Sequence, residues 1–218
     1  MGVAATARRR TARTRLDRAA VVTAACALLD DEGLPALSMA RLGERLGVTA
    51  MALYRHVVDR DDLETAVVEL VLADLSVPDV GAGDWAHGVE GWMREVRRHW
   101  LEHPWLGGLL GTRTELSPPW LAALDQLART LAAAGLPPAA VARELVRISR
   151  VTTGIVSLEL AAPLPHAARL GEAMVDSLPR GERARWRPII RALARYGDDD
   201  LFDDIVASTV DRVRAATR

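Results

Sequence analysis

Residues 37–63 of the chain read LSMARLGERLGVTAMALYRHVVDRDDL and contain two short helical patterns that meet at Gly47. Gly47 has no β-carbon and therefore tolerates the positive φ that a tight turn often requires, while Thr49 can cap the helix that follows. The apolar residues recur at spacings that suit two short helices on a common core; they are Ala40, Leu42, Leu46, Val48 and Leu53. The stretch predicts a helix-turn-helix.

The second helix of this motif, predicted over Thr49–His56, turns Leu53 inward and leaves a face available to solvent. Such a helix fits the major groove of DNA, and its N-terminus and its hydroxyl, guanidinium and imidazole groups can meet phosphates and bases. The candidate DNA-binding residues are Ser38, Thr49, Ala50, Met51, Ala52, Tyr54, Arg55, His56 and Arg60. A helical hairpin with a Gly turn is also common in proteins that do not bind DNA, and there Tyr54 would pack inside.

Charge is unevenly distributed along the chain. Residues 1–60 contain ten Arg and six acidic residues, a net charge of +4, whereas the remaining residues carry −5. The chain contains no Lys, so all 28 basic residues are Arg. A basic amino-terminal part on a chain of net charge −1 favours a polyanion as partner at that end.

The composition is that of a folded protein rather than a disordered one. The chain has 218 residues, of which 50% are hydrophobic and 26% charged, enough to bury a sizeable core. No apolar run has the length of a membrane span and no signal peptide is recognisable, so we expect a cytoplasmic location. The single Cys26 cannot form an intramolecular disulfide and is predicted to fill the core.

Gly and Pro residues divide the chain into predicted helices with no strand pattern, which gives an all-α fold class. We expect a flexible Arg-rich arm over 1–16, a helix-turn-helix DNA-binding domain over 17–62 and a helical effector-binding and dimerisation domain over 63–218. In the first of the two helical domains, Asp17 starts a helix that ends at Gly33, Ser38 caps the next, and Asp59 caps the helix that leads into the second domain. The later helices are predicted over 84–103, 104–110, 118–134, 138–160, 164–177, 183–196 and 200–216.

The stretch RLDRAAVVTAACALLDDEGLPALSMARLGERLGVTAMALYRHVVDRDDL, with its LGV turn and LYRHV tip, resembles the tetracycline-repressor-like (TetR) family of transcriptional regulators. The segments GLLGTRTE at 108–115, LAALDQLARTLAAAGLPP and RISRVTTGIVSLE are similar to the body of the tetracycline-repressor subgroup. The resemblance implies a three-helix head, a linking fourth helix and a homodimer joined by two late helices of each subunit. It also implies a ligand-responsive regulator, most often a repressor, on a pseudo-palindromic operator.

Several positions depart from the tetracycline repressor. Ala40 stands where that protein has an arginine that reaches a guanine, and Ala50 and Met51 stand at positions of its polar reading residues. Small apolar groups favour contact with thymine methyls, and Arg55 is the long donor that remains near the centre of the reading helix. We therefore expect Arg55→Ala to weaken operator binding.

The metal-dependent drug site of the tetracycline repressor is not reproduced either. Its magnesium-ligating histidine aligns near Leu109 or Leu110, and another drug-binding histidine aligns near Ser76. His99 and His103 lie four residues apart, a spacing that by itself is weak evidence for a metal pair. We expect no metal site and no cofactor, and an effector other than a metal-chelated tetracycline.

Five of the six Trp residues, at 85, 92, 100, 105 and 120, lie in one stretch of the body. Such a stripe forms either an ordinary core or the lining of a pocket for a bulky, largely apolar and aromatic effector, whose anionic or carbonyl group Arg113 can meet. The candidate effector-binding residues are Trp92, Val96, Trp100, Trp105, Leu109, Arg113, Trp120, Ser149 and Thr152.

Two helices carry apolar stripes that suit a symmetric dimer. One stripe comprises Val141, Leu145, Ile148, Thr152, Ile155 and Val156, and the other comprises Leu201, Ile205, Val206, Thr209, Val210 and Val213. Two alternatives remain open: a DNA-binding protein without small-molecule control, and a small helical enzyme. The sequence offers no catalytic motif in support of the enzyme.

Overall fold

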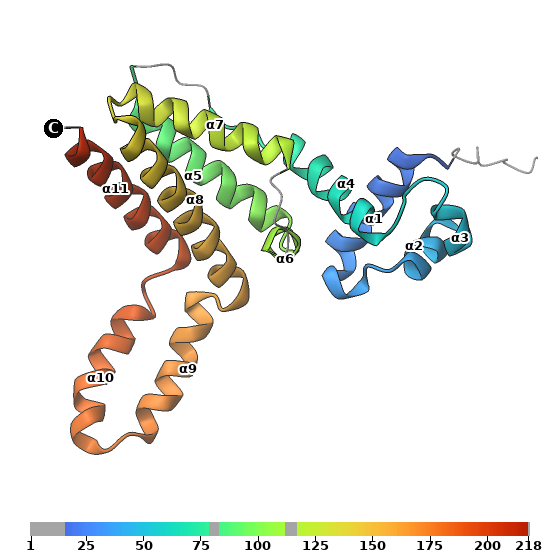
Figure 1. The fold of residues 1–218 in the computed structure, drawn as a ribbon. Coiled ribbons are helices and arrows are strands. Elements are labelled where there is room, and N and C mark those ends of the chain that lie inside the picture. Colours follow the sequence, from blue (N-terminus) through green and yellow to red (C-terminus); the bar gives the residue numbers. More distant parts are fainter. Residues whose placement is uncertain (1–15, 79–82, 112–116, 218) are drawn as a thin grey trace, which may run out of the picture. The chain divides into compact units, whose positions relative to one another are not determined.

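The computed structural model describes residues 16–78, 83–111 and 117–217. Within these residues all regular structure is helical, which confirms the all-α prediction (Figure 1). The helices are α1 (Arg18–Glu32), the 3-10 turn η1 (Leu34–Ala36), α2 (Met39–Leu46), α3 (Ala50–Leu53), α4 (Arg60–Ala73), α5 (Trp85–Glu102), α6 (Leu106–Gly111), α7 (Pro118–Ala133), α8 (Pro138–Ala161), α9 (Leu164–Ser177), α10 (Arg180–Leu193) and α11 (Asp198–Ala216).

The chain divides into two compact units, Met1–Val67 and Val68–Arg218. We call them the head and the body. The division falls inside α4 rather than at its first turn, where the sequence pattern had put it. A boundary that falls inside a continuous helix is not marked by Gly, Pro or a capping residue, because the backbone hydrogen bonds of the helix continue across the boundary.

The head is a small bundle, and its helices α1 and α2 begin at polar caps. The side chain of Asp17 accepts a hydrogen bond from the amide of Ala20 at 2.8 Å, and the hydroxyl of Ser38 accepts one from the amide of Arg41 at 3.2 Å. Both caps satisfy amides that have no partner inside the helix. The core of the head is made of fully buried aliphatic side chains: Val21, Ala25, Leu28, Leu42, Leu53 and Leu63.

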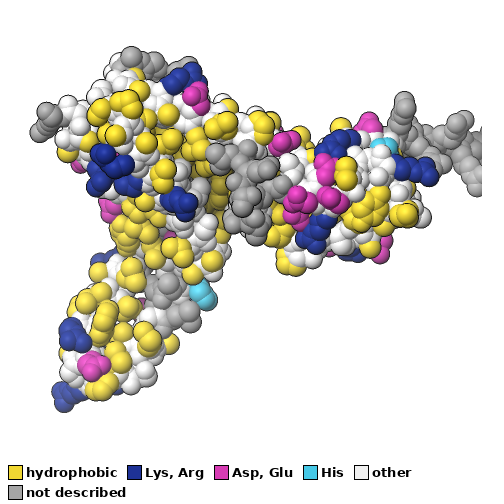
Figure 2. Space-filling model, in the orientation of Figure 1, with side chains coloured by type: hydrophobic (Ala, Val, Ile, Leu, Met, Phe, Trp, Pro, Cys, Tyr) yellow, Lys and Arg dark blue, Asp and Glu magenta, His cyan; other side chains and the backbone are white. Residues whose placement is uncertain are grey.

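The body is built on α5, which packs against α7, α8 and α11. Trp92, Met93 and Val96 on α5 are fully buried, and so are Ile148 on α8 and Phe202 on α11. Beyond this bundle, α9 and α10 pack on each other as a hairpin (Figure 1). Figure 2 shows hydrophobic side chains among basic ones on the visible face of that hairpin.

The two predicted dimer stripes face largely inward in the subunit itself. Ile148, Thr152 and Val156 are buried where α8 meets α5 and α7, and four of the six residues of the α11 stripe are buried as well: Val206, Thr209, Val210 and Val213. The assignment of these stripes to the dimer surface was therefore wrong for most residues. An apolar stripe in the sequence shows that one helix face is buried, but not whether the subunit's own core or a second subunit covers that face.

Two late helices begin earlier than predicted. Helix α10 starts at Arg180 instead of Arg183, directly after Pro179, and α11 starts at Asp198 instead of Asp200. In the second case the Asp200 carboxylate accepts a hydrogen bond from the amide of Gly197 at 2.8 Å, so Asp200 stabilises the first turn from inside the helix. Among the helices of the described residues, none is both long and apolar enough to cross a membrane.

Candidate nucleic-acid interface and aromatic core

The turn between α2 and α3 is tight and is fixed by backbone hydrogen bonds. Gly47 has φ of 67° and ψ of 32°, the left-handed conformation that its sequence position predicted. The amide of Val48 donates to the carbonyl of Gly43 at 2.9 Å. Thr49 occupies the cap position of α3, but its side chain makes no capping hydrogen bond, so that part of the prediction was wrong.

Most of the candidate DNA-binding residues are accessible at or beside α3. Met51 is 76% exposed and Tyr54 is 46% exposed, so Tyr54 is not a core residue. Ser38, Thr49, Arg55 and Arg60 are exposed, while Ala50, Ala52 and His56 are partly so. The structure thus brings these residues to a surface of the head, with Leu53 as the buried anchor of the helix.

The described arginines of the head differ in whether they are paired. Four of them make ion pairs within the head: Arg18 with Asp62, Arg41 with Glu32 and Glu44, Arg45 with Asp31, and Arg60 with Glu64. Arg55 is exposed and makes no ion pair with any residue that the structure describes. The guanidinium at the tip of α3 is therefore the one in this part of the head that is available to an anionic partner.

The basic character of residues 1–60 depends on the arm more than on the folded head. Five of the ten arginines lie at positions 8–15, outside the described residues, as does most of the predicted arm. In the head, acidic residues cluster at the end of α1, where Asp31 and Glu32 pair with arginines of α2. These ion pairs neutralise most of the charge on α2, which leaves Arg55, just beyond α3, as the unpaired positive charge among the described residues of the head.

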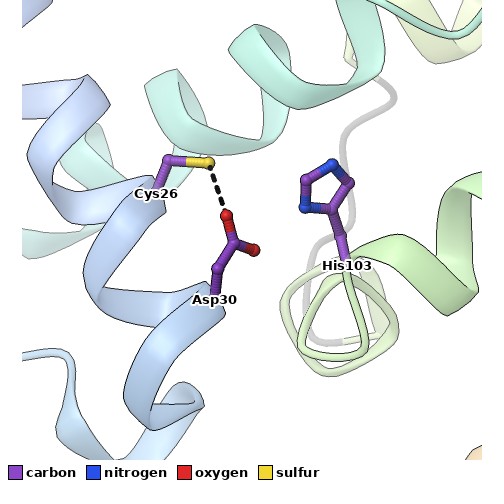
Figure 3. Close-up of side chains that lie close together, drawn as sticks. All are labelled: Cys26, Asp30 and His103. Carbon is purple, nitrogen blue, oxygen red and sulfur yellow. Dashed lines mark hydrogen bonds between the residues drawn. The ribbon is translucent and has the colours of Figure 1, made fainter.

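Cys26 lies on α1 at an intermediate degree of burial, so the prediction of a core cysteine was wrong (Figure 3). Its thiol donates to the carboxylate of Asp30 one turn later, with 3.8 Å between sulfur and oxygen. Partial burial, the negative charge of Asp30 and this hydrogen bond raise the pKa of Cys26 to about 11. The thiol therefore stays protonated at neutral pH and is a poor nucleophile.

The Trp residues of the body pack on one another between α5 and α7. The ring centroids of Trp92 and Trp120 are 5.8 Å apart, and those of Trp100 and Trp120 are 5.4 Å apart. The indole N–H of Trp92 donates to the carbonyl of Ala123 at 2.8 Å. We call Trp92, Trp100 and Trp120 the Trp cluster; its rings are buried and fill the space between the two helices.

The other candidate effector residues surround this cluster unevenly. Val96, Trp105, Leu109 and Thr152 are buried. The hydroxyl of Thr152 donates to the carbonyl of Ile148 at 2.8 Å, and that of half-buried Ser149 donates to the carbonyl of Val146 at 3.1 Å, so both serve their own helix. Arg113 lies outside the described residues.

A hollow of ≈ 220 Å³ lies in the body between the end of α4 and α7. Its lining is mainly apolar, with one amide and one guanidinium at its edge: Leu72, Ala73, Leu75, Val77, Pro119, Ala122, Ala123, Gln126 and Arg129. Ala123 belongs both to this hollow and to the Trp cluster, because its carbonyl accepts the Trp92 hydrogen bond. The hollow therefore adjoins the Trp cluster and also borders the last turn of α4.

Sequence reasoning missed two residues that the structure singles out. Gly43, inside α2, allows the turn before α3 to approach the helix: a β-carbon built there would lie 2.8 Å from the carbonyl oxygen of Val48. The sequence signal for Gly43 is a glycine within a short helix. Glycine lowers helix stability, so its presence there indicates a position where close packing leaves no room for a side chain. His99 is the other residue. The sequence spacing offers it only as weak evidence for a metal pair with His103, whereas in the structure it is a buried side chain bonded to the backbone of α4.

Two protein-family profiles match the chain. The profile described as "Bacterial regulatory proteins, tetR family" matches residues 21–67, and the profile described as "Tetracyclin repressor-like, C-terminal domain" matches residues 77–194. The first match covers α1 to α3 and the start of α4, and the second covers most of the body.

The curated relatives bear the names of transcriptional regulators. An HTH-type transcriptional regulator of Saccharopolyspora erythraea is 35% identical over 64% of this chain and 59% of its own length. The HTH-type transcriptional repressor DrrR1 of Streptomyces coeruleorubidus is 30% identical, and the match spans 66% of this chain and 53% of that protein. The chain thus spans little more than half of these two relatives. The tetracycline repressor protein class C of Escherichia coli is 30% identical over 87% of this chain and 86% of its own length.

Solved structures with a similar fold are also regulators of the TetR family by name. ActR of Streptomyces coelicolor in complex with actinorhodin matches with a TM-score of 0.79 and 26% identity, covering 93% of this chain and 97% of that one. A possible TetR family transcriptional regulator from the same organism matches with a TM-score of 0.78 and 27% identity, covering 91% and 99%. With both family profiles matched, this chain belongs to the TetR family of bacterial regulatory proteins, which are transcriptional regulators and not enzymes.

Proposed function

We propose that the chain is a ligand-responsive transcriptional regulator that acts as a repressor. It binds a pseudo-palindromic operator as a homodimer and is released by a small, largely apolar or aromatic effector. Family membership supports the class of protein, and the repressor DrrR1 supports the direction of control. Because its partner is chromosomal DNA, we place its action in the cytoplasm.

The observation that carries this proposal is the accessible face of α3. Met51 and Tyr54 are exposed there, and beside them Arg55 lacks an ion pair among the described residues while its neighbours in the head are paired. An exposed apolar side chain on a short helix and an unpaired guanidinium directly after that helix suit a major groove, where thymine offers a methyl group and guanine two acceptors. Symmetric pairing of two subunits would place two such helices about one turn of DNA, or a multiple of it, apart.

For the dimer, we propose the outward faces of α8 and α11 as the contact. Two large apolar side chains on α8 are directed away from the subunit core: Val146 is 54% exposed and Leu158 is 68% exposed. Selection of bound DNA from a random pool tests operator and assembly together. A two-fold symmetric consensus is expected, and equal retention of all sequences would instead indicate a non-specific DNA-binding protein.

Arg55→Ala tests the reading face directly. We expect the substitution to weaken binding to the selected operator by about tenfold or more, because a good guanidinium contact to a base contributes about 1–3 kcal/mol. Arg45→Ala is the matched control: it removes the same charge from the same unit, but Arg45 is paired with Asp31. Fluorescence anisotropy at fixed salt compares the two. Equal losses in both variants would reduce the effect to net charge and contradict a specific role for Arg55.

We propose that the effector binds at the Trp cluster and its surroundings, the set given above with Arg113, Ser149 and Thr152 as its polar members. The support is the concentration of aromatic side chains beside the hollow at the end of α4. ActR, a similar structure, holds actinorhodin. The hollow of ≈ 220 Å³ is smaller than the roughly 300 Å³ at which ligand pockets begin, so a bulky effector would have to displace Trp side chains.

A second candidate function, a regulator without small-molecule control, is favoured by the close packing of these Trp rings. A titration of Trp fluorescence with a panel of aromatic compounds separates the two candidates. Saturable quenching together with loss of operator binding is expected for an effector. The absence of any response across the panel, with operator binding intact, would favour the second candidate.

A further inference from the structure

His99, on α5, is a buried polar side chain that the reading face and the Trp cluster do not use. It is 2% exposed, and its Nε2 lies 2.8 Å from the carbonyl oxygen of Val71. Val71 lies in the last turn of α4, and its carbonyl also accepts a hydrogen bond from the amide of Asp74 at 3.2 Å. His99 therefore caps the end of α4 from the side.

The other nitrogen of the ring defines the protonation state of His99. Nδ1 is buried and has no hydrogen-bond partner. Since a carbonyl can only accept, Nε2 must carry the proton that bonds to Val71, and in the neutral ring Nδ1 is then an unprotonated acceptor. A second proton on Nδ1 would be a buried donor without an acceptor, which costs free energy.

The charges around the ring do not compensate for this cost. Burial, the largest effect, lowers the pKa of His99 below 6.5; the hydrogen bond to Val71 opposes it, the neighbouring His103 and Arg98 lower the pKa further, and Glu102 raises it slightly. In the last turns of α4 the charged residue is Glu69, and Asp74 follows the helix directly. Three carboxylates of the helices that pack on α5 are held in ion pairs with Arg94 and Arg97 of α5; they are Glu159 on α8 and Asp199 and Asp203 on α11.

We propose that His99 is a positioning residue that holds the last turn of α4 against α5 through its neutral ring, and that protonation of this ring releases the turn and lowers operator affinity. The proposal rests on the proposed function, since α4 is one continuous helix whose first turn belongs to the head and whose last turn His99 holds. We call the arrangement in which the buried, neutral ring of His99 bonds to Val71 the held state. A state in which the ring is exposed to water binds a proton more readily than the held state does. Acid therefore shifts the population away from the held state.

The experiment measures operator affinity of the full-length protein from pH 8 to pH 5.5. Wild-type affinity is expected to fall as the pH drops below about 6.5, by at most about tenfold per pH unit for one proton. His99→Gln keeps an N–H donor for Val71 but cannot titrate, so it should bind as the wild type does at pH 8 and lose the His99-dependent part of the acid response. His99→Leu lacks the donor and should bind more weakly even at pH 8.

His87 provides the control. His87→Gln alters an exposed histidine at the start of α5 and should leave the wild-type profile unchanged. An identical pH profile for wild type and His99→Gln would overturn the proposal.

Two measurements on the free protein distinguish failure of this inference from failure of the proposed function. NMR of the imidazole nitrogens should show the Nε2–H tautomer of His99 and a pKa below 6.5. Hydrogen exchange of the α4 amides near Val71, corrected for the pH dependence of the intrinsic exchange rate, should show protection that falls on acidification in the wild type but not in His99→Gln. If no operator binding is found at any pH, the proposed function fails, and these two measurements still decide whether His99 holds α4.

Discussion

Gly43 lies where α2 meets the turn that leads into α3, and it is buried. A β-carbon at this position would be 2.8 Å from the carbonyl oxygen of Val48 and 3.2 Å from the amide nitrogen of Ala50. Both neighbours are backbone atoms of the turn, which cannot move aside as the end of a flexible side chain can. At the scale of the residue, a single missing methyl group sets the distance between the two helices of the motif.

We therefore expect Gly43→Ala to destabilise the head by about 1–3 kcal/mol, because forcing extra volume into a packed site shifts the backbone. Thermal or urea unfolding followed by circular dichroism measures the loss. Gly181→Ala in α10 is the control, since nothing lies within 4 Å of the β-carbon built there. Ala favours helix over Gly, so the control should be neutral or stabilising by up to about 1 kcal/mol. Equal effects of the two substitutions would contradict the role of Gly43.

At the scale of the element, the start of α4 is tied to α1 and to the segment that connects α3 to α4. The Asp62 carboxylate accepts two hydrogen bonds from Arg18, at 2.7 and 2.8 Å, and a third from the amide of Val58 at 2.8 Å. Arg18 also donates to the carbonyl of His56 at 3.1 Å. These contacts place the reading helix relative to the helices on either side of it, because one guanidinium and one carboxylate reach all three.

The hydrogen bonds from Arg18 and then Val58 lower the pKa of Asp62 from 3.8 to about 2. A depressed carboxyl pKa contributes stability above pH 3.8 that is lost as the pH falls through about 2. At pH 7 we expect Asp62→Asn to lower the free energy of unfolding by about 1 kcal/mol, since solvent screens this partly exposed pair. Urea unfolding of wild type and variant from pH 7 to pH 2 should show the difference shrinking in acid. A difference that stays constant would contradict the ion pair as its cause.

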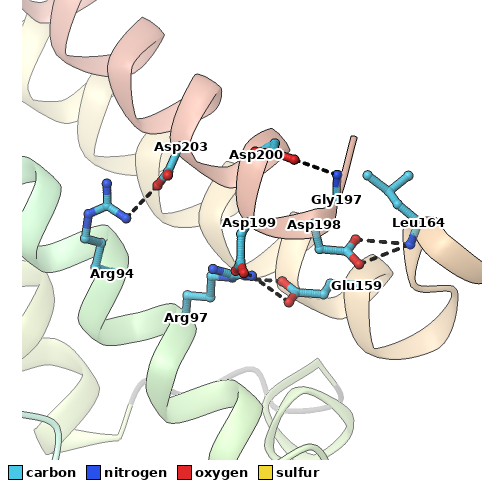
Figure 4. Close-up of polar contacts among 9 residues, drawn as sticks. All are labelled: Arg94, Arg97, Glu159, Leu164, Gly197, Asp198, Asp199, Asp200 and Asp203. Carbon is cyan, nitrogen blue, oxygen red and sulfur yellow. Dashed lines mark hydrogen bonds and ion pairs between the residues drawn. The ribbon is translucent and has the colours of Figure 1, made fainter. Parts of the chain in front are cut away.

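At the scale of the whole molecule, a polar cluster joins the far end of α5 to α8, α9 and α11 (Figure 4). Arg97 donates to Glu159 at 2.7 and 2.9 Å and to Asp199 at 2.6 Å, and its guanidinium lies 4.7 Å from the ring centroid of Phe202. Next to it, both carboxylate oxygens of Asp198 accept from the amide of Leu164, at 3.1 and 3.3 Å. The first residue of α9 is thereby bonded to the first residue of α11, which fixes the base of the hairpin that α9 and α10 form.

Asp198→Ala should loosen this hairpin while the bundle stays folded. The substitution removes the side-chain cap of the first turn of α9, which contributes about 1 kcal/mol. Hydrogen exchange is expected to quicken at α9 and α10 and to remain unchanged at α5. Asp203→Ala is the control, because Asp203 makes an exposed ion pair with Arg94 and no hydrogen bond or ion pair with the described residues of α9. Unchanged exchange in the hairpin of the Asp198 variant would show that the contact with Leu164 does not hold it.

Much of the fold could be predicted from local rules. The caps at Asp17, Ser38 and Asp59, and the left-handed turn at Gly47, follow from short-range geometry that a few neighbouring residues specify. The same rules failed at Thr49, whose hydroxyl makes no cap, and at Cys26, which lies at the edge of the core. In both cases the residue type suited the prediction, and the neighbours in space decided otherwise.

The amino-acid sequence alone was enough to predict the helices, the motif around Gly47 and the family. Helix periodicity, turn chemistry and caps depend on residues within a few positions of one another. Only the tertiary structure decided which described arginine of the head makes no ion pair, which apolar residues of α8 and α11 face the subunit's own core, and that His99 bonds to Val71. These are contacts between distant segments. Their partners are chosen by packing and by the desolvation of polar groups in three dimensions, which no local pattern records.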